Sequence, residues 1–551
     1  MKKITKTILN ISSIIGLSTV IIPIMVSCSN STKYDDFENV VDLKNNFCEN
    51  KQLGQEYIYK KINSDDDPFF ENIDKYANDD SILFYNIGQI AVSHKYVPII
   101  HMLHVLEKNP NKEIYFFINK DNFSNSFYDT FFKNNVPIFP NLHFYSYNGG
   151  SVDFDDGYFE YGFEMVKIVN KVINENKIDK TKIVFTTDEF YFLNRLEVYT
   201  KGDMLNTNGF IDDYLLFYEI RELNMVADGT GSVDFFQNTF FDYMFYNQEY
   251  FMLNSNNQYE YAIQFMKFFA TLTHEQKIEY IKNNNVLNIT QIFYYLFIAS
   301  KNNNDSSFTR VNFYLPALEM VLDVNNNYSA ILSHNDPYNL FFNPYNVDKL
   351  NLIKLLSTLN DESKELFYKT IGINDNQKND INSYESQFNN SLNIVYSGSK
   401  LDNVQTIANE ARLLIKFYDN NISKNKNIKI WFKGHPRDNI NYKQKLLDYI
   451  MLTRPEVTNS IYFLNNTVPM EIYLGKPFMQ NDEIQNRQVL FYGTFSTVIL
   501  YLYCNKQQDN IQNILLSESN IKDINYFFGN KYNSILFNVN KVLEISEFLK
   551  K

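Results

Sequence analysis

Short apolar runs alternate with longer helical patterns in two parts of this chain, and this alternation limits the possible fold more than any other feature. In the first part, runs of strand length lie at residues 81–85, 113–119, 142–147 and 182–186, with helical patterns at 96–107 and 163–175. In the second part, they lie at 392–396, 427–432, 461–464 and 535–538, with helical patterns at 404–418, 470–474 and 541–550. Strands that alternate with helices form parallel βαβ units. The sequence therefore predicts an α/β protein with two Rossmann-like domains.

The chain has 551 residues, which is enough for two or three domains. We expect Rossmann-like domains at 79–250 and 386–551, joined by a helical connection at 251–385 where the pattern is aromatic and helical. Two such domains imply a cleft between them, and clefts between domains are the usual ligand sites. No strand-to-helix turn carries the G-x-G-x-x-G pattern, so a dinucleotide is not indicated.

The first 27 residues have the pattern of an export signal. Lysines at the start precede an apolar run at 8–26, which ends in Ser27-Cys28. This pattern resembles a bacterial lipoprotein signal, in which cleavage leaves Cys28 as a lipid-modified N-terminus. We therefore expect a signal at 1–27, a lipidated polar tether at 28–78, and a location at the extracellular face of the cell membrane. An uncleaved anchor helix is the alternative.

The charge and the cysteine content of the chain argue against several classes of function. The net charge is −13 and the isoelectric point is near 5.2, which argues against nucleic acid as a partner because phosphate binding needs a basic face. After cleavage, only Cys48 and Cys504 would remain as possible thiols, and two distant cysteines define neither a disulfide framework nor a zinc site. His101 and His104 lie three residues apart on one helix face but lack a third ligand, so we expect packing rather than metal binding.

Residues 427–438 read NIKIWFKGHPRD and combine a buried-strand pattern with basic side chains. The strand pattern runs to Lys433, Gly434 lets the backbone turn sharply, and Pro436 cannot donate a ladder hydrogen bond. We therefore expect His435 at the carboxyl end of a strand, the edge where open α/β sheets bind ligands. Lysine, histidine and arginine this close together are typical of a phosphate site. A charged loop with a solvent-facing histidine is the alternative.

Three further motifs accompany this strand, namely Tyr396-Ser397-Gly398-Ser399, Val468-Pro469-Met470-Glu471 and Gly493-Thr494-Phe495-Ser496-Thr497. Together with the helical run at 359–375, and in this order, they resemble the bacterial sialyltransferases of the Pasteurella and Photobacterium type, glycosyltransferase family 80. The resemblance covers roughly residues 359–503. It implies an inverting enzyme of the GT-B fold that moves sialic acid from CMP-sialic acid to a glycan hydroxyl, with the first domain on the acceptor side.

The resemblance also implies roles for individual residues. His435 would donate a proton or hydrogen bond to the departing phosphate of CMP, and Ser496 and Thr497 would bind that phosphate at a helix N-terminus. Glu471 would accept hydrogen bonds from the ribose hydroxyls. Further contacts to the nucleotide sugar would come from Lys433, Gly434, Pro436, Ser397, Gly398 and Ser399. Taken alone, Glu471 could also be an ordinary first-turn glutamate, and the Ser496-Thr497 pair a helix cap.

Two aspartates compete for the role of the base. The family carries a D-D-G-S-like turn after a strand of the first domain. Phe154-Asp155-Asp156-Gly157 is closer to this motif in its letters, whereas Ala227-Asp228-Gly229 fits the order of strands better. We favour Asp228, with Asp156 as the alternative. An Asp-Gly pair is by itself most often only a turn.

The implied reaction is a single displacement without cofactor or metal. Asp228 would deprotonate the glycan hydroxyl while CMP leaves toward His435. One alternative is a D-x-D metal site at Asp153 and Asp155, but this belongs to the single-sheet GT-A fold, which the second α/β unit disfavours. The other alternative is a surface lipoprotein adhesin, a glycan-binding module on a transferase-like fold without turnover.

Overall fold

The computed structural model describes the following residues, which all belong to one compact unit: 68–88, 92–120, 126–133, 136–148, 158–188, 214–226, 255–283, 289–300, 307–315, 347–387, 392–398, 401, 403–423, 427–435, 442–479, 488–493, 511–517 and 541–550. The predicted signal, the lipidation site Cys28 and most of the tether lie outside these residues.

The first sheet has seven parallel strands in the order β5-β2-β1-β6-β7-β8-β9. Their bounds are β5 (Leu142–Tyr147), β2 (Ile114–Asn119), β1 (Ile82–Ile87), β6 (Ile183–Asp188), β7 (Glu222–Val226), β8 (Arg310–Leu315) and β9 (Val347–Lys349). From β1 the chain builds the sheet first toward β2 and β5, and then, from β6 onward, toward β9. The order of strands therefore reverses between β1 and β6, which is the topological switch point of this sheet.

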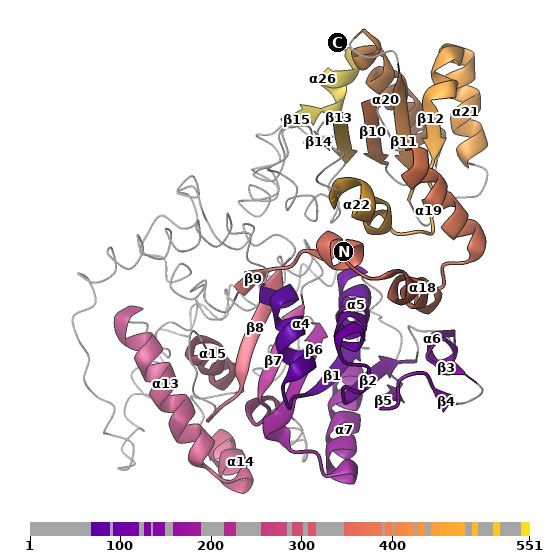
Figure 1. Cartoon of the computed structure of the whole chain (residues 1–551). Coiled ribbons are helices and arrows are strands. Elements are labelled where there is room, and N and C mark those ends of the chain that lie inside the picture. The colour runs from indigo at the N-terminus through magenta and orange to yellow at the C-terminus, as the bar shows by residue number, and fades with distance from the viewer. Residues whose placement is uncertain are drawn as a thin grey trace. The chain divides into compact units, whose positions relative to one another are not determined.

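Helices α4 (Pro68–Asn78) and α5 (Val92–Lys108) pack side by side on one face of the first sheet (Figure 1). In α4, the apolar residues recur at helical spacing, and Phe69, Ile73, Tyr76 and Ala77 are buried. Helix α7 (Tyr158–Asn176) contacts β5 and β2. Smaller elements are α6 (Ser126–Thr130), the hairpin of β3 (Phe132–Lys133) with β4 (Val136–Pro137), and the 3₁₀ turns η2 (Lys180–Lys182) and η3 (Leu215–Tyr218).

The second sheet has six parallel strands in the order β12-β11-β10-β13-β14-β15. Their bounds are β12 (Ile461–Phe463), β11 (Ile428–Lys433), β10 (Leu392–Ser397), β13 (Gln488–Gly493), β14 (Ile511–Ser517) and β15 (Lys541–Glu544). The helices of this part are α20 (Val404–Ile422), α21 (Tyr442–Thr453), α22 (Met470–Met479) and α26 (Ile545–Lys550), with the 3₁₀ turn η6 (Pro455–Ser460). The switch point of this sheet lies between β10 and β13.

The segment between β7 and β10 contributes helices and two strands. Its helices are α13 (Ser255–Thr271), α14 (His274–Asn283), α15 (Ile289–Ala299), α17 (Leu352–Ser357), α18 (Asp361–Thr370) and α19 (Asp375–Gln387). Helix α17 packs against both α5 and α22, so its leucines belong to the same core as residues of the first sheet.

The predicted α/β class with two Rossmann-like parallel sheets is confirmed. The stretch at 251–385, expected as a helical connection, contains six helices within the described residues and also β8 and β9, which extend the first sheet. The last part of the predicted tether forms α4, which is held by its buried apolar side chains. The predicted final helix begins later, at Ile545, since residues 541–544 pair with β14. The predicted strand at 535–538 lies outside the described residues.

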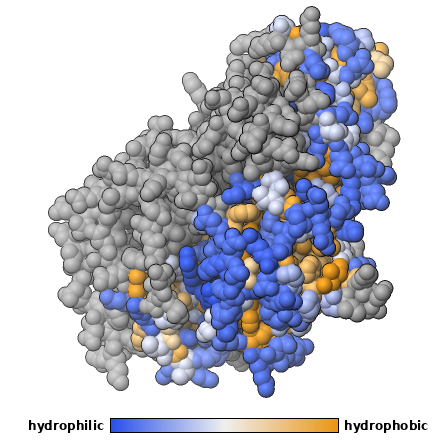
Figure 2. Space-filling view, in the orientation of Figure 1, coloured by the Kyte–Doolittle hydropathy of each residue, from blue (hydrophilic) through white to orange (hydrophobic). Residues whose placement is uncertain are grey.

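Much of the described surface visible in Figure 2 is hydrophilic, in keeping with the net charge of −13. The large hydrophobic side chains exposed in the described part are Ile138, Val404, Met451 and Leu452. Of the helices in the described ranges, none combines the length and hydropathy that crossing a bilayer requires.

Candidate functional site

Three strand ends meet at the switch point of the second sheet. Ser397 at the end of β10 lies in register with Lys433 at the end of β11 and with Gly493 at the end of β13. Because the strands are parallel, the residues that follow them emerge at the same edge. The structure therefore brings Ser397, Gly398 and the Lys433-Gly434-His435 turn together at one edge of the second sheet.

Gly398 is held where a side chain would not fit. Its backbone N–H donates to the carbonyl of Lys433 at 2.9 Å. A Cβ atom built on Gly398 would lie 2.6 Å from Cε2 of Phe432 and 3.3 Å from Oε2 of Glu410, which is itself only 3% exposed. The turn after β10 can therefore lie against the end of β11 only because residue 398 is glycine.

Lys433 has a structural role within the chain. Its side chain is 5% exposed, and its ammonium group donates to the carbonyl of Asn466 at 2.9 Å. The side-chain carbonyl of Asn466 also accepts a hydrogen bond from Tyr442 at 2.6 Å. The loop between β12 and α22 is thereby held at the carboxyl edge of β11. The predicted contact of Lys433 with a nucleotide sugar stays a prediction.

Glu471 lies in the first turn of α22 and is 3% exposed. Burial raises the pKa of the Tyr96 hydroxyl on α5, and the negative charge of Glu471 raises it further. A carboxylate buried at the start of a helix is stabilised by the helix dipole. This position suits a group that accepts hydrogen bonds from a ligand at the same edge, and the ribose role stays a prediction.

His435 follows the end of β11 by two residues and is half-buried, at the strand end that the sequence predicts. Of the two candidate bases, Asp228 follows the last residue of β7 by two positions, and Asp156 precedes the first residue of α7 by two positions. Both aspartates lie outside the described residues. The same holds for Ser399, Pro436, Ser496 and Thr497, whose roles stay predictions.

The carboxyl edge of the first sheet carries a buried polar row that sequence reasoning missed. The Tyr147 hydroxyl donates to Oδ1 of Asn86 at 2.7 Å, and Nδ2 of Asn86 donates to Oγ1 of Thr187 at 3.1 Å. We call these three residues the edge row. Asn119 and Asp188 also end strands here, and both are buried. The available signal was that β2, β1 and β6 turn polar at or next to their last residue.

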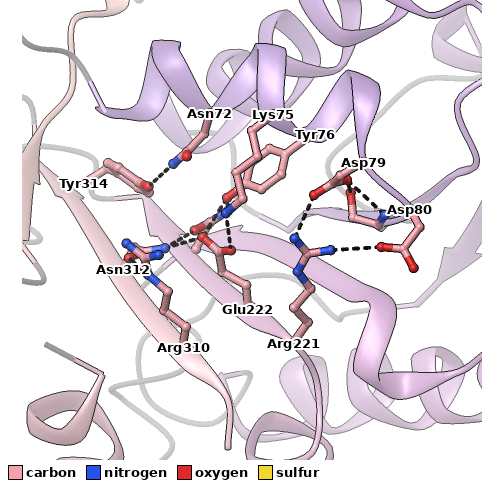
Figure 3. A network of polar contacts seen from close by, with 12 residues as sticks. Asn72, Lys75, Tyr76, Asp79, Asp80, Arg221, Glu222, Arg310, Asn312 and Tyr314 are labelled. Carbon is pink, nitrogen blue, oxygen red and sulfur yellow. Dashed lines mark hydrogen bonds and ion pairs between the residues drawn. The ribbon is translucent and has the colours of Figure 1, made fainter. Parts of the chain in front are cut away.

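A second polar network lies at the amino end of β7 and ties α4 to the sheet (Figure 3). Oε1 of Glu222 accepts hydrogen bonds from the Tyr76 hydroxyl and from Nδ2 of Asn312, both at 2.6 Å. Its other oxygen pairs with the ammonium group of Lys75 at 3.4 Å. Asn312 also donates to Asn224 at 2.9 Å. We call these five residues the Glu222 network. Burial and the charge of Glu222 raise the pKa of Tyr76, which keeps it a donor.

The histidine pair on α5 is used for packing. Nδ1 of His101 lies 2.7 Å from the Tyr85 hydroxyl, and burial, with a smaller contribution from His104, lowers the pKa of His101 to about 3. Nε2 of His104 lies 2.8 Å from the carbonyl of Leu355 on α17. Within the described ranges, no three histidine, cysteine or acidic side chains gather into a metal-binding group.

No protein-family model matches the chain, and no curated protein sequence matches it. Among solved structures, the GT-B domain of a sialyltransferase from Photobacterium damselae is 14% identical, with a TM-score of 0.41, over 84% of this chain and 98% of that chain. A Photobacterium 2,6-sialyltransferase, in a ternary complex with CMP and lactose, is 12% identical, with a TM-score of 0.43, over 84% of this chain and 78% of that chain. UDP-GlcNAc 2-epimerase from Methanocaldococcus jannaschii is 14% identical, with a TM-score of 0.36, over 85% and 90%. Likenesses this weak carry no argument about activity or substrate, and the fold is assigned from the strand order and register of the chain itself.

Proposed function

We propose that this protein is an inverting glycosyltransferase of the GT-B type that moves sialic acid from CMP-sialic acid to a glycan hydroxyl. The observation that carries the proposal is the position of His435, directly after β11 and beside the switch point of the second sheet. A partly buried imidazole at that edge can meet the phosphate of a nucleotide bound there. The sequence resemblance supplies the identity of the nucleotide sugar.

Two described residues shape this edge for a nucleotide. Gly398 lets the turn after β10 lie against the end of β11, because a Cβ atom there would meet the Phe432 ring at 2.6 Å. Glu471 places a buried carboxylate at the start of α22, where it can accept two hydroxyl hydrogen bonds. The loop that leads to Glu471 is anchored by Lys433, so β11 and α22 are held together.

In the proposed mechanism, a carboxylate of the first domain takes the proton of the glycan hydroxyl as that oxygen attacks the anomeric carbon. The bond to CMP breaks on the opposite face, which inverts the configuration, and the developing negative charge on the phosphate accepts a hydrogen bond or proton from His435. Asp228 is the proposed base and Asp156 its alternative. Ser496 and Thr497 are proposed to add donors to the phosphate.

The proposal is tested by measuring the release of CMP from CMP-sialic acid, with and without lactose as the acceptor. We expect His435→Ala to reduce the rate about 10²–10³-fold, since it removes a donor to the leaving group. His143→Gln is the matched control, because His143 is about 39% exposed on β5 and pairs with Glu113 at 2.9 Å. Equal rates for wild type and His435→Ala would refute the role of His435. No release above background would favour the adhesin instead.

The base is assigned by comparing Asp156→Ala with Asp228→Ala in the same assay. We expect Asp228→Ala to lose transfer to lactose while CMP still binds, because the base acts on the acceptor rather than on the nucleotide. Unchanged transfer in both variants would discard both assignments. Full activity after treatment with EDTA is expected, since the proposed donors to the phosphate need no metal.

We also propose that Cys28 carries the lipid anchor and that the catalytic part lies at the extracellular face of the membrane. The support is the sequence pattern at 1–28 alone. Mass spectrometry of the mature N-terminus tests it, with a diacylglyceryl group on Cys28 expected. An unmodified Met1 in the mature protein would refute the anchor.

A further inference from the structure

We propose that the amino edge of the first sheet holds a second binding site, separate from the proposed catalytic one, and that this site takes an uncharged, hydroxyl-rich sugar. The inference goes beyond the proposed function and does not depend on it. It rests on an open cavity of about 500 Å³ at this edge, on the buried ammonium group of Lys112 beside it, and on the balance of charges in its lining.

The cavity lies where three loops meet at the amino ends of neighbouring strands. Residues 79–82 lead into β1, residues 109–113 lead into β2, and residues 176–179 lead toward β6. β1 pairs in parallel with both β2 and β6, so these loops emerge at one edge of the sheet. Open α/β sheets hold their principal ligands at the carboxyl edge, and this cavity lies at the other edge. Its volume is within the range of small-molecule sites, roughly 300–1,000 Å³.

Hydrogen bonds and ion pairs hold these loops in place, so the cavity is preformed. Nη2 of Arg221 donates to Oδ2 of Asp79 at 2.7 Å (Figure 3). Nδ2 of Asn109 donates to the carbonyl of Ala77 at 2.8 Å, and Oδ1 of Asn109 accepts from the backbone N–H of Asn111 at 3.1 Å. A preformed site loses little conformational entropy when a ligand binds.

Lys112 places a buried donor beside the cavity. Its side chain is 4% exposed, and its ammonium group donates to the carbonyl and to Oδ1 of Asp79, at 2.8 and 3.3 Å. An ammonium group has three hydrogens, and within the described residues the third has no acceptor. Buried donors of native proteins are almost always paired, and Lys112 lines the cavity, so a ligand there can supply the missing acceptor.

The charges around the cavity indicate an uncharged ligand. The lining has four carboxylates and two ammonium groups, which are those of Asp79, Asp80, Glu113, Asp179, Lys112 and Lys177. Outside the lining, Arg221 pairs with Asp79 at 2.7 Å. Lys182 likewise pairs with Asp80 at 3.0 Å. The four carboxylates therefore face four cations, so neither an anion nor a cation gains a net attraction here.

A hydroxyl group fits both kinds of charge in this lining. It can accept from the ammonium group of Lys112 or from the amide of Asn111, and it can donate to a carboxylate. Ile82 and Ile178, both half-buried, add apolar surface to the lining for the C–H groups of a ring. Several hydroxyl groups on one small, partly apolar ring are the chemistry of an uncharged sugar.

The inference is tested by titration calorimetry of the purified protein with maltose, cellobiose, N,N′-diacetylchitobiose and mannobiose, without nucleotide. We expect wild type to bind at least one of these disaccharides. Asn111→Ala should weaken that binding about three- to tenfold, since a hydrogen bond between neutral groups is lost. Lys112→Met keeps the aliphatic stem and should weaken the binding about tenfold or more, because a charged donor is lost.

Asn174→Ala is the matched control, because Asn174 is exposed and lies two residues before Asn176 of the lining without lining the cavity itself. It should leave sugar binding unchanged. The side chain of Asn111 is exposed and makes no hydrogen bond within the described residues. Asn111→Ala should therefore melt at the wild-type temperature, so that weaker binding in this variant cannot come from unfolding. Thermal melting of Lys112→Met shows whether that variant folds.

Each outcome separates the inference from the proposed function. Sugar binding that depends on Asn111 in a protein that never releases CMP would support the site and overturn the transferase. CMP release together with sugar binding that is equal in wild type and Asn111→Ala would overturn the site alone, since the sugar would then be held elsewhere. Binding of none of the four disaccharides by wild type would also overturn the site.

Discussion

The first sheet carries buried polar side chains at both ends of its strands, and the two sets differ in how completely they are paired. In the Glu222 network, the carboxylate accepts from Tyr76, Asn312 and Lys75, and Asn312 bonds Asn224 in turn. The network ties α4 to two strands that lie far from it in the chain (Figure 3). The edge row lies at the opposite end of the sheet and leaves two buried donors without acceptors in the described part of the chain.

This difference bears on how much each polar set stabilises the fold. Burying a polar group costs stability unless it is hydrogen-bonded, so the fully paired Glu222 network is compatible with a structural role. The edge row has fewer hydrogen bonds for each buried group and gives up part of that stability. Substitutions in the two sets should therefore differ in how strongly they lower stability.

The largest loss of stability is expected for a substitution in the Glu222 network. Glu222→Leu leaves the Tyr76 hydroxyl and one amide hydrogen of Asn312 buried without an acceptor, so the free energy of unfolding should fall by about 3–5 kcal/mol, as for other broken buried pairs. Urea denaturation measures it. Glu164→Leu is the control, because Glu164 is about half exposed in its pair with Lys167 and should change stability by less than about 1 kcal/mol. A loss at Glu222 no larger than the control would mean that the network does not stabilise the fold.

A smaller effect is expected at the switch point of the second sheet, which is shaped by backbone rather than by polar side chains. In Gly398→Ala, the new Cβ would lie 2.6 Å from the Phe432 ring, so overpacking should cost about 1–3 kcal/mol and displace the turn. CMP binding by calorimetry should weaken as well. Gly372→Ala is the control: its φ of 80° makes alanine strained, by about 1 kcal/mol, but no atom lies within 4 Å. If Gly398→Ala bound CMP as wild type does, the turn would not belong to the nucleotide site.

A pH-dependent effect is expected at His101, which contacts both Tyr76 of the Glu222 network and Tyr85, the neighbour of Asn86. Its pKa is lowered from 6.5 to about 3 by burial, so between these pH values the unfolded chain binds the proton and the folded chain does not. Stability is therefore fully present above pH 6.5 and falls as pH drops below it, by about 1.4 kcal/mol per pH unit from this group.

Urea denaturation at pH 7, 6 and 5 measures that slope. His101→Gln keeps a polar partner for Tyr85 but cannot be protonated, so its slope should be shallower by about that amount. The variant itself is expected to be less stable at pH 7, because a close-packed site is changed. Parallel pH curves for wild type and variant would show that His101 is not the buried neutral group described here.

Much of the fold could be predicted because it depends on local patterns. The strand that leads to His435 is a short apolar run followed by Gly434, and it occurs as β11 at nearly the predicted residues. Long-range pairing was harder to predict. β8 and β9 lie in a stretch with a helical and aromatic pattern, and they join the first sheet through the pairing of β8 with β7 and of β9 with β8, which local patterns do not show.

Some residues of the candidate site could likewise be predicted from local sequence patterns, and others could not. Gly398, Lys433 and His435 could be assigned to one edge because each follows a strand-like run. The anchoring of Asn466 by Lys433 could not, since a sequence does not show that a basic side chain will turn back onto a loop carbonyl. The edge row was missed because Asn86 and Thr187 are 101 positions apart and share no motif. Such a row becomes visible only when the strand order is known.

The smallest loss of stability is expected in the edge row, and it gives the sharpest test of the comparison between the two polar sets. Thr187→Val removes one hydroxyl that accepts a single hydrogen bond within the chain, so unfolding should become easier by only about 1 kcal/mol, well below the loss at Glu222. Urea denaturation of Thr187→Val beside Glu222→Leu measures the difference. A loss at Thr187 as large as that at Glu222 would mean that the two polar sets stabilise the sheet equally, and the distinction between them would be lost.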